Sequence, residues 1–188
     1  MPAATAPAHL PLRPHPTEQG PQGLSVSVSV PALPPAGDWC LCYEIRGDVG
    51  DLRLPEPATP GPADGLWRHT CLEAFVREGK GPTYREFNFS PSGQWAVYRF
   101  RAERERAPQD PPPSLGPAIG LEPGPDVLRI LVRVPHALLP ERPGAIGLTA
   151  VIETRDGRTS HWALHHPRPE RPDFHHAAGW THPPALTA

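Results

Sequence analysis

The sequence predicts an all-β fold, an antiparallel β-sandwich, and three observations support this prediction. The chain of 188 residues contains 30 prolines and 17 glycines. A proline inside a helix costs about 3 kcal/mol, so long helices are not expected. Several short segments alternate between apolar and polar residues with the period of two that is typical of a half-buried strand. Turn sequences separate these segments, and a sandwich of about seven strands would bury one face of each.

The expected strands begin with two clear alternating segments. In residues 24–30 (LSVSVSV), Leu24 and the three valines share one face, which we expect to point into the core. Residues 39–46 (WCLCYEIR) repeat this pattern between two Gly-Asp pairs. Further strands are expected at residues 71–77, at 84–90, from Gln94 onward, at 127–134, at 146–154 and at 158–164.

The chain length is that of one domain. Residues 1–22 are rich in proline, and we expect them to be a disordered N-terminal segment. Residues 23–182 are expected to form the sandwich domain. Within it, residues 53–65 and 106–125 are rich in proline, which predicts two long loops.

A turn sequence predicts the register of one hairpin. Residues 90–93 (SPSG) are typical of a type I turn followed by a left-handed glycine. Such a turn pairs Ser90 with Gln94, which places Glu86 opposite Tyr98. One face of the hairpin is then apolar, and the other mixes polar and aromatic groups. The apolar face holds Phe87, Phe89, Trp95 and Val97, and the other face holds Tyr84, Glu86, Asn88, Ala96 and Tyr98.

A second hairpin is expected to turn at residues 156–157 (DG), a pair typical of a two-residue type I′ turn. The register of this hairpin follows from the turn length. It pairs Glu153 with Ser160 and Val151 with Trp162.

Composition argues against several kinds of partner. The formal net charge of −2 gives no reason to expect nucleic acid or an anionic membrane surface. No apolar run approaches the roughly 20 residues of a membrane helix, and the N-terminus does not resemble a secretory signal. We therefore expect a cytoplasmic protein, in which Cys40, Cys42 and Cys71 stay reduced. The sequence does not predict the oligomeric state.

Four segments carry a family resemblance. Residues 67–76 (WRHTCLEAFV) and 84–95 (YREFNFSPSGQW) resemble the central hairpins of DOMON-like domains, a β-sandwich group that includes family 9 carbohydrate-binding modules. Residues 162–167 (WALHHP) and 172–175 (PDFH) resemble the closing segment of a bacterial branch of this group. The resemblance covers nearly the whole sandwich. It implies a jelly-roll-like arrangement, and characterised relatives bind a sugar or haem.

A haem or metal site is one alternative function. Haem-binding DOMON domains offer a methionine and a histidine as axial ligands, whereas the only methionine of this chain is Met1. A pair of histidines is the remaining option, with His161, His165 and His175 as weak metal candidates. Their spacing matches no zinc signature. We therefore expect no cofactor, and keep a haem- or metal-binding redox module as the alternative.

Two glutamates are the central candidates for ligand contact. Glu73 and Glu86 are expected on neighbouring strands, and both alternate away from the apolar face. They can accept hydrogen bonds from ligand hydroxyls, or act as acid and base on a glycoside. They can also pair with arginines along the surface of the sheet, for which the candidates are Arg68, Arg85, Arg99 and Arg101.

The complete predicted site combines these carboxylates with amide and aromatic groups. Asn88, Tyr84 and Tyr98 share the face of Glu86 and mix donors, acceptors and apolar rings, as a polyol-binding surface requires. An ordinary solvent-exposed face would carry the same residue types. The predicted ligand-binding residues are Trp67, Arg68, Glu73, Tyr84, Glu86, Asn88 and Tyr98.

The sequence therefore predicts a non-catalytic domain that binds a carbohydrate or a related small molecule. In a cytoplasm, a soluble sugar or nucleotide sugar would suit this prediction. Besides the redox module, a protein-interaction domain is an alternative that the proline-rich loops permit. A hydrolase that uses Glu73 and Glu86 ranks last.

Overall fold

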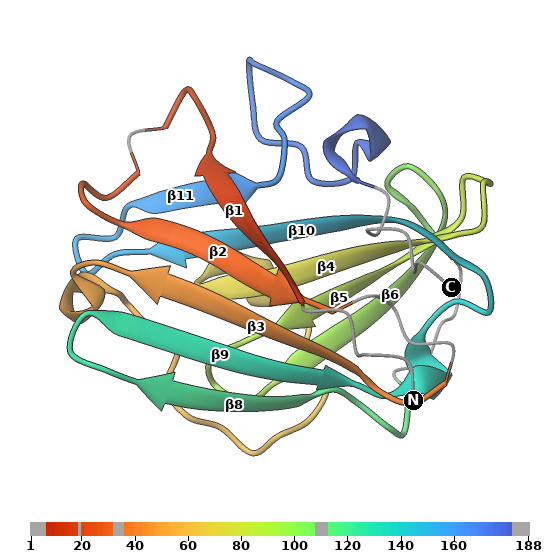
Figure 1. The fold of residues 1–188 in the computed structure, drawn as a ribbon, viewed down its shortest axis with the longest axis horizontal. Coiled ribbons are helices and arrows are strands. Elements are labelled where there is room, and N and C mark those ends of the chain that lie inside the picture. The colour runs from red at the N-terminus through yellow and green to blue at the C-terminus, as the bar shows by residue number, and fades with distance from the viewer. Residues whose placement is uncertain (1–6, 19, 32–35, 108–112, 182–188) are drawn as a thin grey trace.

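The computed structural model describes residues 7–18, 20–31, 36–107 and 113–181. In these residues the fold is all-β, as the sequence predicts, but it has eleven antiparallel strands where about seven are expected, and four short 3-10 helices (Figure 1). No helix in the described part of the chain is long and apolar enough to cross a membrane. The strands are β1 Ala8–Pro14, β2 Ser25–Val30, β3 Trp39–Arg46, β4 Cys71–Glu78, β5 Tyr84–Phe89, β6 Trp95–Ala102, β7 Glu105–Arg106, β8 Ala118–Pro123, β9 Val127–Val134, β10 Pro143–Glu153 and β11 Thr159–Ala163. The 3-10 helices are η1 Val49–Asp51, η2 Leu66–Arg68, η3 His136–Leu138 and η4 Ala177–Gly179.

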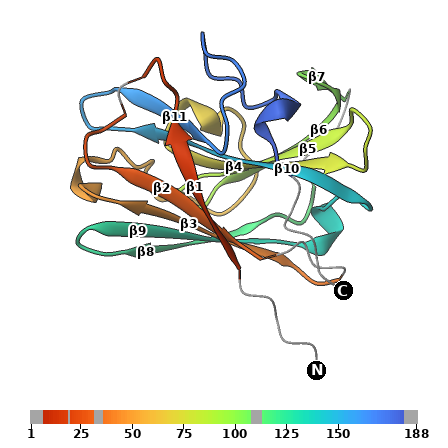
Figure 2. The same cartoon turned by 45° about the horizontal axis from the view of Figure 1, so that its top comes forward.

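The eleven strands form one hydrogen-bonded series that folds into two layers. The order is β7-β6-β5-β4-β10-β11-β1-β2-β3-β9-β8. Strand β1 joins the layers, because its first part pairs with β2 and its end pairs with β11 through Arg13 and Pro14. Figure 2 shows β1 crossing between the layer of β2, β3, β8 and β9 and the layer of β4, β5, β6, β10 and β11.

The main hydrophobic core fills the space between the layers. Alternate residues of β2 and β3 point into it, including Val26, Val28 and Val30, as their period of two predicts. Phe87 and Phe89 enter the same core from β5, and both are fully buried. Burial of these apolar faces stabilises the sandwich by about 25 cal/mol for each Å² removed from water.

The prediction that residues 1–22 are disordered is wrong for residues 8–14, which form β1. Ala8, Leu10 and Leu12 alternate along this strand and pack on the main core, although only Leu12 is buried. Its order also depends on partners on both sides, because β2 and β11 lie next to it in the series. Residues 1–6 and 19 lie outside the described residues, as does residue 182 at the expected end of the domain.

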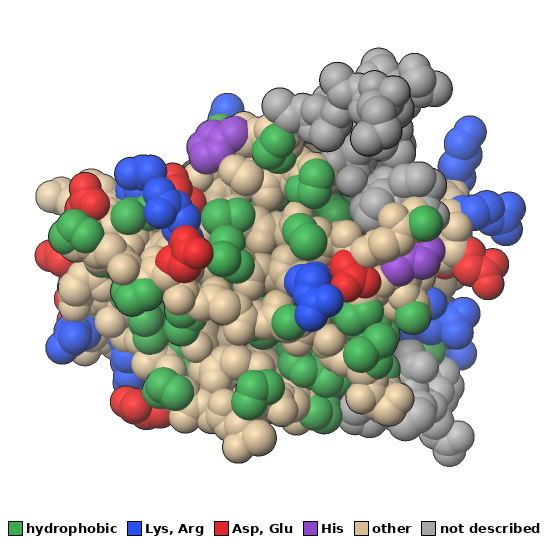
Figure 3. Space-filling model, turned by 60° about the horizontal axis from the view of Figure 1, so that its bottom comes forward, with side chains coloured by type: hydrophobic (Ala, Val, Ile, Leu, Met, Phe, Trp, Pro, Cys, Tyr) green, Lys and Arg blue, Asp and Glu red, His purple; other side chains and the backbone are tan. Residues whose placement is uncertain are grey.

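The expected loop at residues 106–125 also contains a strand, β8, which pairs with β9 along its whole length. Strand β8 is the edge of its layer. An edge strand tolerates glycine and proline, because one side of its backbone needs no partner. Its residues Ala118–Pro123 are therefore mostly exposed and lack a recognisable apolar face. Figure 3 views the molecule from the side of this edge, where hydrophobic side chains are scattered among polar surface.

The two predicted hairpin registers have different outcomes. The turn at residues 90–93 pairs Glu86 with Tyr98, as predicted. The turn at 156–157 is longer than predicted: the Thr154 amide bonds the Arg158 carbonyl at 2.9 Å, and Gly157 adopts a positive φ of 84°. The loop therefore has three residues, and the pairing shifts by one.

The corrected register changes which side chains face the core. Val151 lies opposite His161, not opposite Trp162, and Ile152 lies opposite Ser160. A shift of one residue moves every side chain to the other face. Trp162 consequently points into the core, and His161 joins the outer face of the layer that contains β4, β5 and β10.

Candidate functional site

Polar side chains lie buried on the outer face of the layer formed by β4, β5, β6, β10 and β11. Thr149 on β10 is paired with Glu73 on β4, which is paired with Asn88 on β5. Glu86 lies one row away, between Phe75 and Tyr98. Glu73 is only 3% exposed and Glu86 only 5% exposed. Carboxyl groups are seldom buried without a reason, so this face differs from an ordinary solvated one.

The C-terminal segment covers this face and accounts for the burial (Figure 2). The Trp180 ring stacks on the Phe75 ring with 5.7 Å between centroids, and its indole N–H donates to the Phe174 carbonyl at 2.9 Å. Gly147 of β10 allows this approach, because a Cβ at that position would lie 2.3 Å from Cδ1 of Trp180. These contacts belong to a second hydrophobic cluster outside the main core.

Asp173 attaches the same segment to the β6–β7 hairpin. Its side chain is 1% exposed and accepts bonds from Arg104 at 2.7 Å and from Arg168 at 3.0 Å. Burial opposes ionisation of Asp173, but the hydrogen bonds and charges of the two arginines outweigh it and lower the pKa of the carboxyl. The segment is therefore held by packing at Trp180 and by charge at Asp173.

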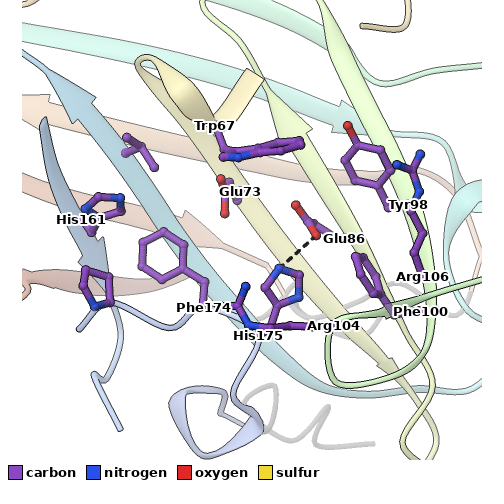
Figure 4. Close-up of a pocket in the computed structure, with 12 residues that line it drawn as sticks. Trp67, Glu73, Glu86, Tyr98, Phe100, Arg104, Arg106, His161, Phe174 and His175 are labelled. Carbon is purple, nitrogen blue, oxygen red and sulfur yellow. Dashed lines mark ion pairs between the residues drawn. The ribbon is translucent and has the colours of Figure 1, made fainter. Parts of the chain in front are cut away.

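A cavity of about 450 Å³ remains between the covering segment, helix η2 and the sheet. This volume falls within the range of small-molecule sites. Figure 4 shows the Trp67 and His175 rings on either side of the two glutamates. The cavity is lined by Trp67, Glu73, Glu86, Tyr98, Phe100, Arg104, Arg106, Val151, His161, Pro172, Phe174 and His175.

Glu86 is oriented by hydrogen bonding within the wall of the cavity. The Asn88 amide donates to Oε1 of Glu86 at 2.7 Å. Burial raises the pKa of Glu86 to about 7, although the Asn88 bond and the charges of Arg106 and Arg104 act in the opposite direction. Glu86 therefore carries a proton for part of the time at neutral pH.

Glu73 is also oriented by a hydrogen bond, in this case from a residue of β10. The Thr149 hydroxyl donates to Oε2 of Glu73 at 3.2 Å. Burial, and secondarily the charge of Glu86, raises the pKa of Glu73 well above its ordinary range. Pairing with arginines is not observed, because no arginine among the described residues lies within ion-pair distance of Glu73 or Glu86. Arg101, for example, pairs with Glu105.

His175 faces Glu86 as a neutral imidazole. Burial, and then the charge of Arg104, lowers its pKa to about 4. The distance of 3.7 Å between its Nε2 and Oε2 of Glu86 is thus a polar contact and not an ion pair at neutral pH. Its Nδ1 lies 2.8 Å from the Tyr84 hydroxyl, which also accepts the Arg104 amide at 3.1 Å. A Tyr84 hydroxyl that donates to Nδ1 leaves an Nε2–H directed at Glu86.

The outer rim of the cavity is aromatic and cationic. Trp67 is 40% exposed, and its ring meets the Tyr98 ring edge-on at 6.0 Å. The Arg106 guanidinium lies over the Tyr98 ring, 4.0 Å from its centroid. The Tyr98 hydroxyl donates to Asp64, and burial followed by this bond raises the pKa of Tyr98.

The backbone of Arg104 has a conformation that is unusual for a side chain of its size. Its φ is 58°, in the left-handed region that favours glycine. This conformation costs an L-residue on the order of 1 kcal/mol. Bonds from its amide to Tyr84 and from its guanidinium to Asp173 hold it in place. The β6–β7 turn thus directs a guanidinium toward the cavity (Figure 4).

The structure separates the predicted site residues into three groups. Trp67, Glu73, Glu86 and Tyr98 line the cavity. Asn88 and Tyr84 lie behind the lining and orient Glu86 and His175. Arg68 is exposed and is not in the lining, because its guanidinium folds back beside Gly65. Arg68 is therefore not brought together with the other predicted residues.

The histidine candidates do not come together as a metal site. His161 and His175 line the cavity, whereas His165 is exposed outside it. His161 is engaged by Glu18, which lies 2.8 Å from its Nδ1. Within the described residues, no three histidine, cysteine, aspartate or glutamate side chains are grouped so that they could hold a metal ion.

Several residues that line the cavity are not among those predicted from the sequence. Phe100 continues the alternation of Tyr84 and Tyr98 along the hairpin, and this signal was available in the sequence. Phe174 lies in a segment that carries the family resemblance. Arg104 and Arg106 gave no local signal, because they belong to a turn and to a two-residue strand.

Comparison with known proteins identifies the fold. No protein-family profile matches the sequence, and no curated protein matches it. A candidate carbohydrate-binding protein from Bacteroides uniformis has a similar structure, with a TM-score of 0.64, 16% identity, and coverage of 93% of this chain and 84% of that chain. A family 9 carbohydrate-binding module from Caldicellulosiruptor kristjanssonii, solved with glucose, has a TM-score of 0.53 at 9% identity and covers 92% and 79%.

The same type of module in complex with cellotriose has a TM-score of 0.54 at 10% identity, with coverage of 92% and 77%. These identities are too low to transfer a ligand. They show that the chain has the sandwich fold of family 9 carbohydrate-binding modules.

Proposed function

We propose that this protein is a non-catalytic carbohydrate-binding domain of the DOMON-like group and that its ligand occupies the cavity beside Trp67. The observation that carries the proposal is the exposed Trp67 ring next to two buried carboxyl groups, Glu73 and Glu86. A sugar ring presents an apolar face that packs on an aromatic side chain and hydroxyls that hydrogen-bond to carboxyl oxygens. The structural similarity to modules solved with glucose and cellotriose supports this class of ligand.

The protonation of the two glutamates favours binding over catalysis. Glycoside hydrolysis requires one protonated carboxyl group and one ionised carboxylate. Burial raises the pKa of both Glu73 and Glu86, and that of Glu73 rises well above its ordinary range. The raised pKa of Glu73 disfavours the ionised form that a base or nucleophile requires, whereas both groups can bond hydroxyls in either protonation state.

The proposal is tested by calorimetric titration of the purified protein with glucose and cellotriose. Trp67→Ala should weaken binding at least about tenfold, because it removes the stacking surface. Glu86→Gln should weaken it less, because the amide still accepts a hydrogen bond. Leu121→Ala is the matched control, since Leu121 is also 40% exposed but lies on β8.

Absence of binding by any of a panel of neutral and charged sugars would refute the proposal. Equal binding by the wild type and Trp67→Ala would show that the sugar occupies another place on the molecule.

A further inference from the structure

Two arginines extend from the β6–β7 hairpin into the wall of the cavity. Arg104 lies in the turn and Arg106 in β7, and both contribute to the lining (Figure 4). They come from the same short hairpin, and Figure 4 shows Arg104 beside His175 and Arg106 beside Tyr98. Neutral sugars require no such pair of cations, so the two residues are not explained by the proposed function alone.

The positive charge of this hairpin is only partly balanced by its neighbours, because Glu105 pairs with Arg101 and Asp64 acts on Arg106 without forming an ion pair. Asp173 is the partner of Arg104, but it is shared with Arg168, so two guanidinium groups face one carboxylate. Arg106 lies over the Tyr98 ring and has no carboxylate within ion-pair distance in the described part of the chain. Arg104 is 52% exposed, and a guanidinium has five N–H donors, so donors remain available to a ligand.

The groups across the cavity do not repel an anion strongly. His175 is neutral at ordinary pH, and its Nε2 is directed at Glu86. Burial raises the pKa of both Glu73 and Glu86 and so favours their protonated forms, and a carboxylic acid donates a hydrogen bond that an anion can accept. The cavity thus combines two cations with weakly charged acids.

We propose that the ligand is an anionic sugar, whose carboxylate or phosphate group is bound by Arg104 and Arg106 while its ring packs on Trp67. This inference rests on the proposed function and narrows its class of ligand. Arginine suits both anions, because its planar fork offers two parallel N–H bonds to their oxygens.

The backbone at Arg104 supports this assignment independently. Its positive φ is maintained by the bond from its amide to the Tyr84 hydroxyl and by the ion pair with Asp173. Residues in such conformations persist where the surroundings over-determine them, and they concentrate at binding sites. The guanidinium is therefore positioned before a ligand arrives, which reduces the entropy lost on binding.

The test compares four probes by calorimetry: glucose, glucuronate, glucose 1-phosphate and inorganic phosphate. At least one of the two anionic sugars should bind at least about tenfold more tightly than glucose, because a charge-assisted bond to arginine is added. The preference of one anionic sugar over the other identifies the anion. Raising the ionic strength should lower the affinity for the anionic sugar and leave the affinity for glucose nearly unchanged.

Arg106→Gln is the decisive variant, and its readout is the ratio of the affinities for the anionic sugar and for glucose. This ratio should fall about tenfold. Arg101→Gln is the control, because it removes the same charge from β6, where Arg101 is exposed and pairs with Glu105. In this control the ratio should stay within about twofold.

The possible failures are distinguishable. If glucose binds at the Trp67 site and neither anionic sugar binds more tightly, the inference is wrong and the proposed function stands. If Arg106→Gln and Arg101→Gln change the ratio equally, the anion is not bound by the β6–β7 hairpin. Binding of inorganic phosphate as tightly as glucose 1-phosphate would show a simple anion site and overturn the inference. If none of the sugars binds, the proposed function fails as well.

Discussion

The two outer faces of this sandwich differ although the strands behind them follow the same alternating pattern. On the layer of β2, β3 and β9, outward side chains such as Cys40 and Leu131 are exposed, and charged residues pair at the surface. On the layer of β4, β5 and β10, nearly every side chain is buried on both faces. The difference is the C-terminal segment, which lies across the second face only.

The comparison shows how a cover changes the chemistry of a sheet. Glu44 on the open face bonds Arg46 and Arg129, and these bonds, that of Arg46 foremost, lower its pKa. Glu73 and Glu86 on the covered face have no such partners among the described residues, and burial raises their pKa. The same residue type is therefore a solvated surface group on one layer and part of a cavity wall on the other.

The largest expected effect comes from removing the cover. Trp180→Ala should lower the free energy of unfolding by about 3 to 5 kcal/mol, because it empties the cluster formed with Phe75 and Tyr84. Leu131→Ala on the open face should cost less than about 1 kcal/mol, since this leucine is 38% exposed. Urea unfolding of both variants checks the comparison. Equal losses would mean that the C-terminal segment does not stabilise the covered face.

The next effect concerns how the free energy of unfolding depends on pH, which should have opposite signs for a glutamate on the covered face and one on the open face. With its pKa raised, Glu73 keeps a proton in the folded state that the unfolded chain releases near pH 4.5. Glu73 therefore contributes a loss of wild-type stability as pH rises above 4.5. Glu73→Gln removes this contribution, so the stability of the variant relative to the wild type should increase from pH 4.5 towards neutral pH.

Glu44→Gln is the counterpart on the open face. The lowered pKa of Glu44 stabilises the wild type above pH 4.5, and this advantage disappears as pH falls through the folded pKa. The variant should therefore be the less stable protein at neutral pH, by less than about 1 kcal/mol because the pair is near the surface. Chemical denaturation from pH 4 to pH 7 measures both variants. The same sign for both would contradict the difference between the faces.

A smaller effect is expected at the ion pairs. Asp173→Asn should cost about 2 kcal/mol, because it leaves Arg104 and Arg168 without their carboxylate on the covered face. Asp38→Asn, which breaks a pair with Arg133 on the open layer, should cost less than about 0.5 kcal/mol. Thermal unfolding of the two variants tests this. A loss at Asp38 as large as that at Asp173 would show that the cover does not strengthen its ion pairs.

The sequence predicted those parts of the fold that depend on neighbouring residues. The turn at residues 90–93 determined the pairing of Glu86 with Tyr98, since turn chemistry sets hairpin register. The turn at 156–157 was misread because a three-residue loop with glycine at its last position resembles a two-residue turn. That single residue reversed the faces of His161 and Trp162.

Strand β1 was missed for a different reason. Its alternation of Ala8, Leu10 and Leu12 is short and contains proline, a residue that argues against an interior strand. Its order also depends on β2 and β11, which follow it in the chain, so the local pattern was not sufficient to predict it.

Local pattern was thus sufficient for the layers of the sandwich and for the placement of Glu73 and Glu86 on one face, because the period of two and the turn types are properties of a few adjacent residues. Only tertiary structure decided that this face is buried and opens into a cavity. The contacts responsible join residues far apart, such as Tyr84 to His175 and Arg104 to Asp173. Tertiary packing brings such pairs together. A sequence window of 11–18 residues cannot contain both members of a pair that lies so far apart in the chain.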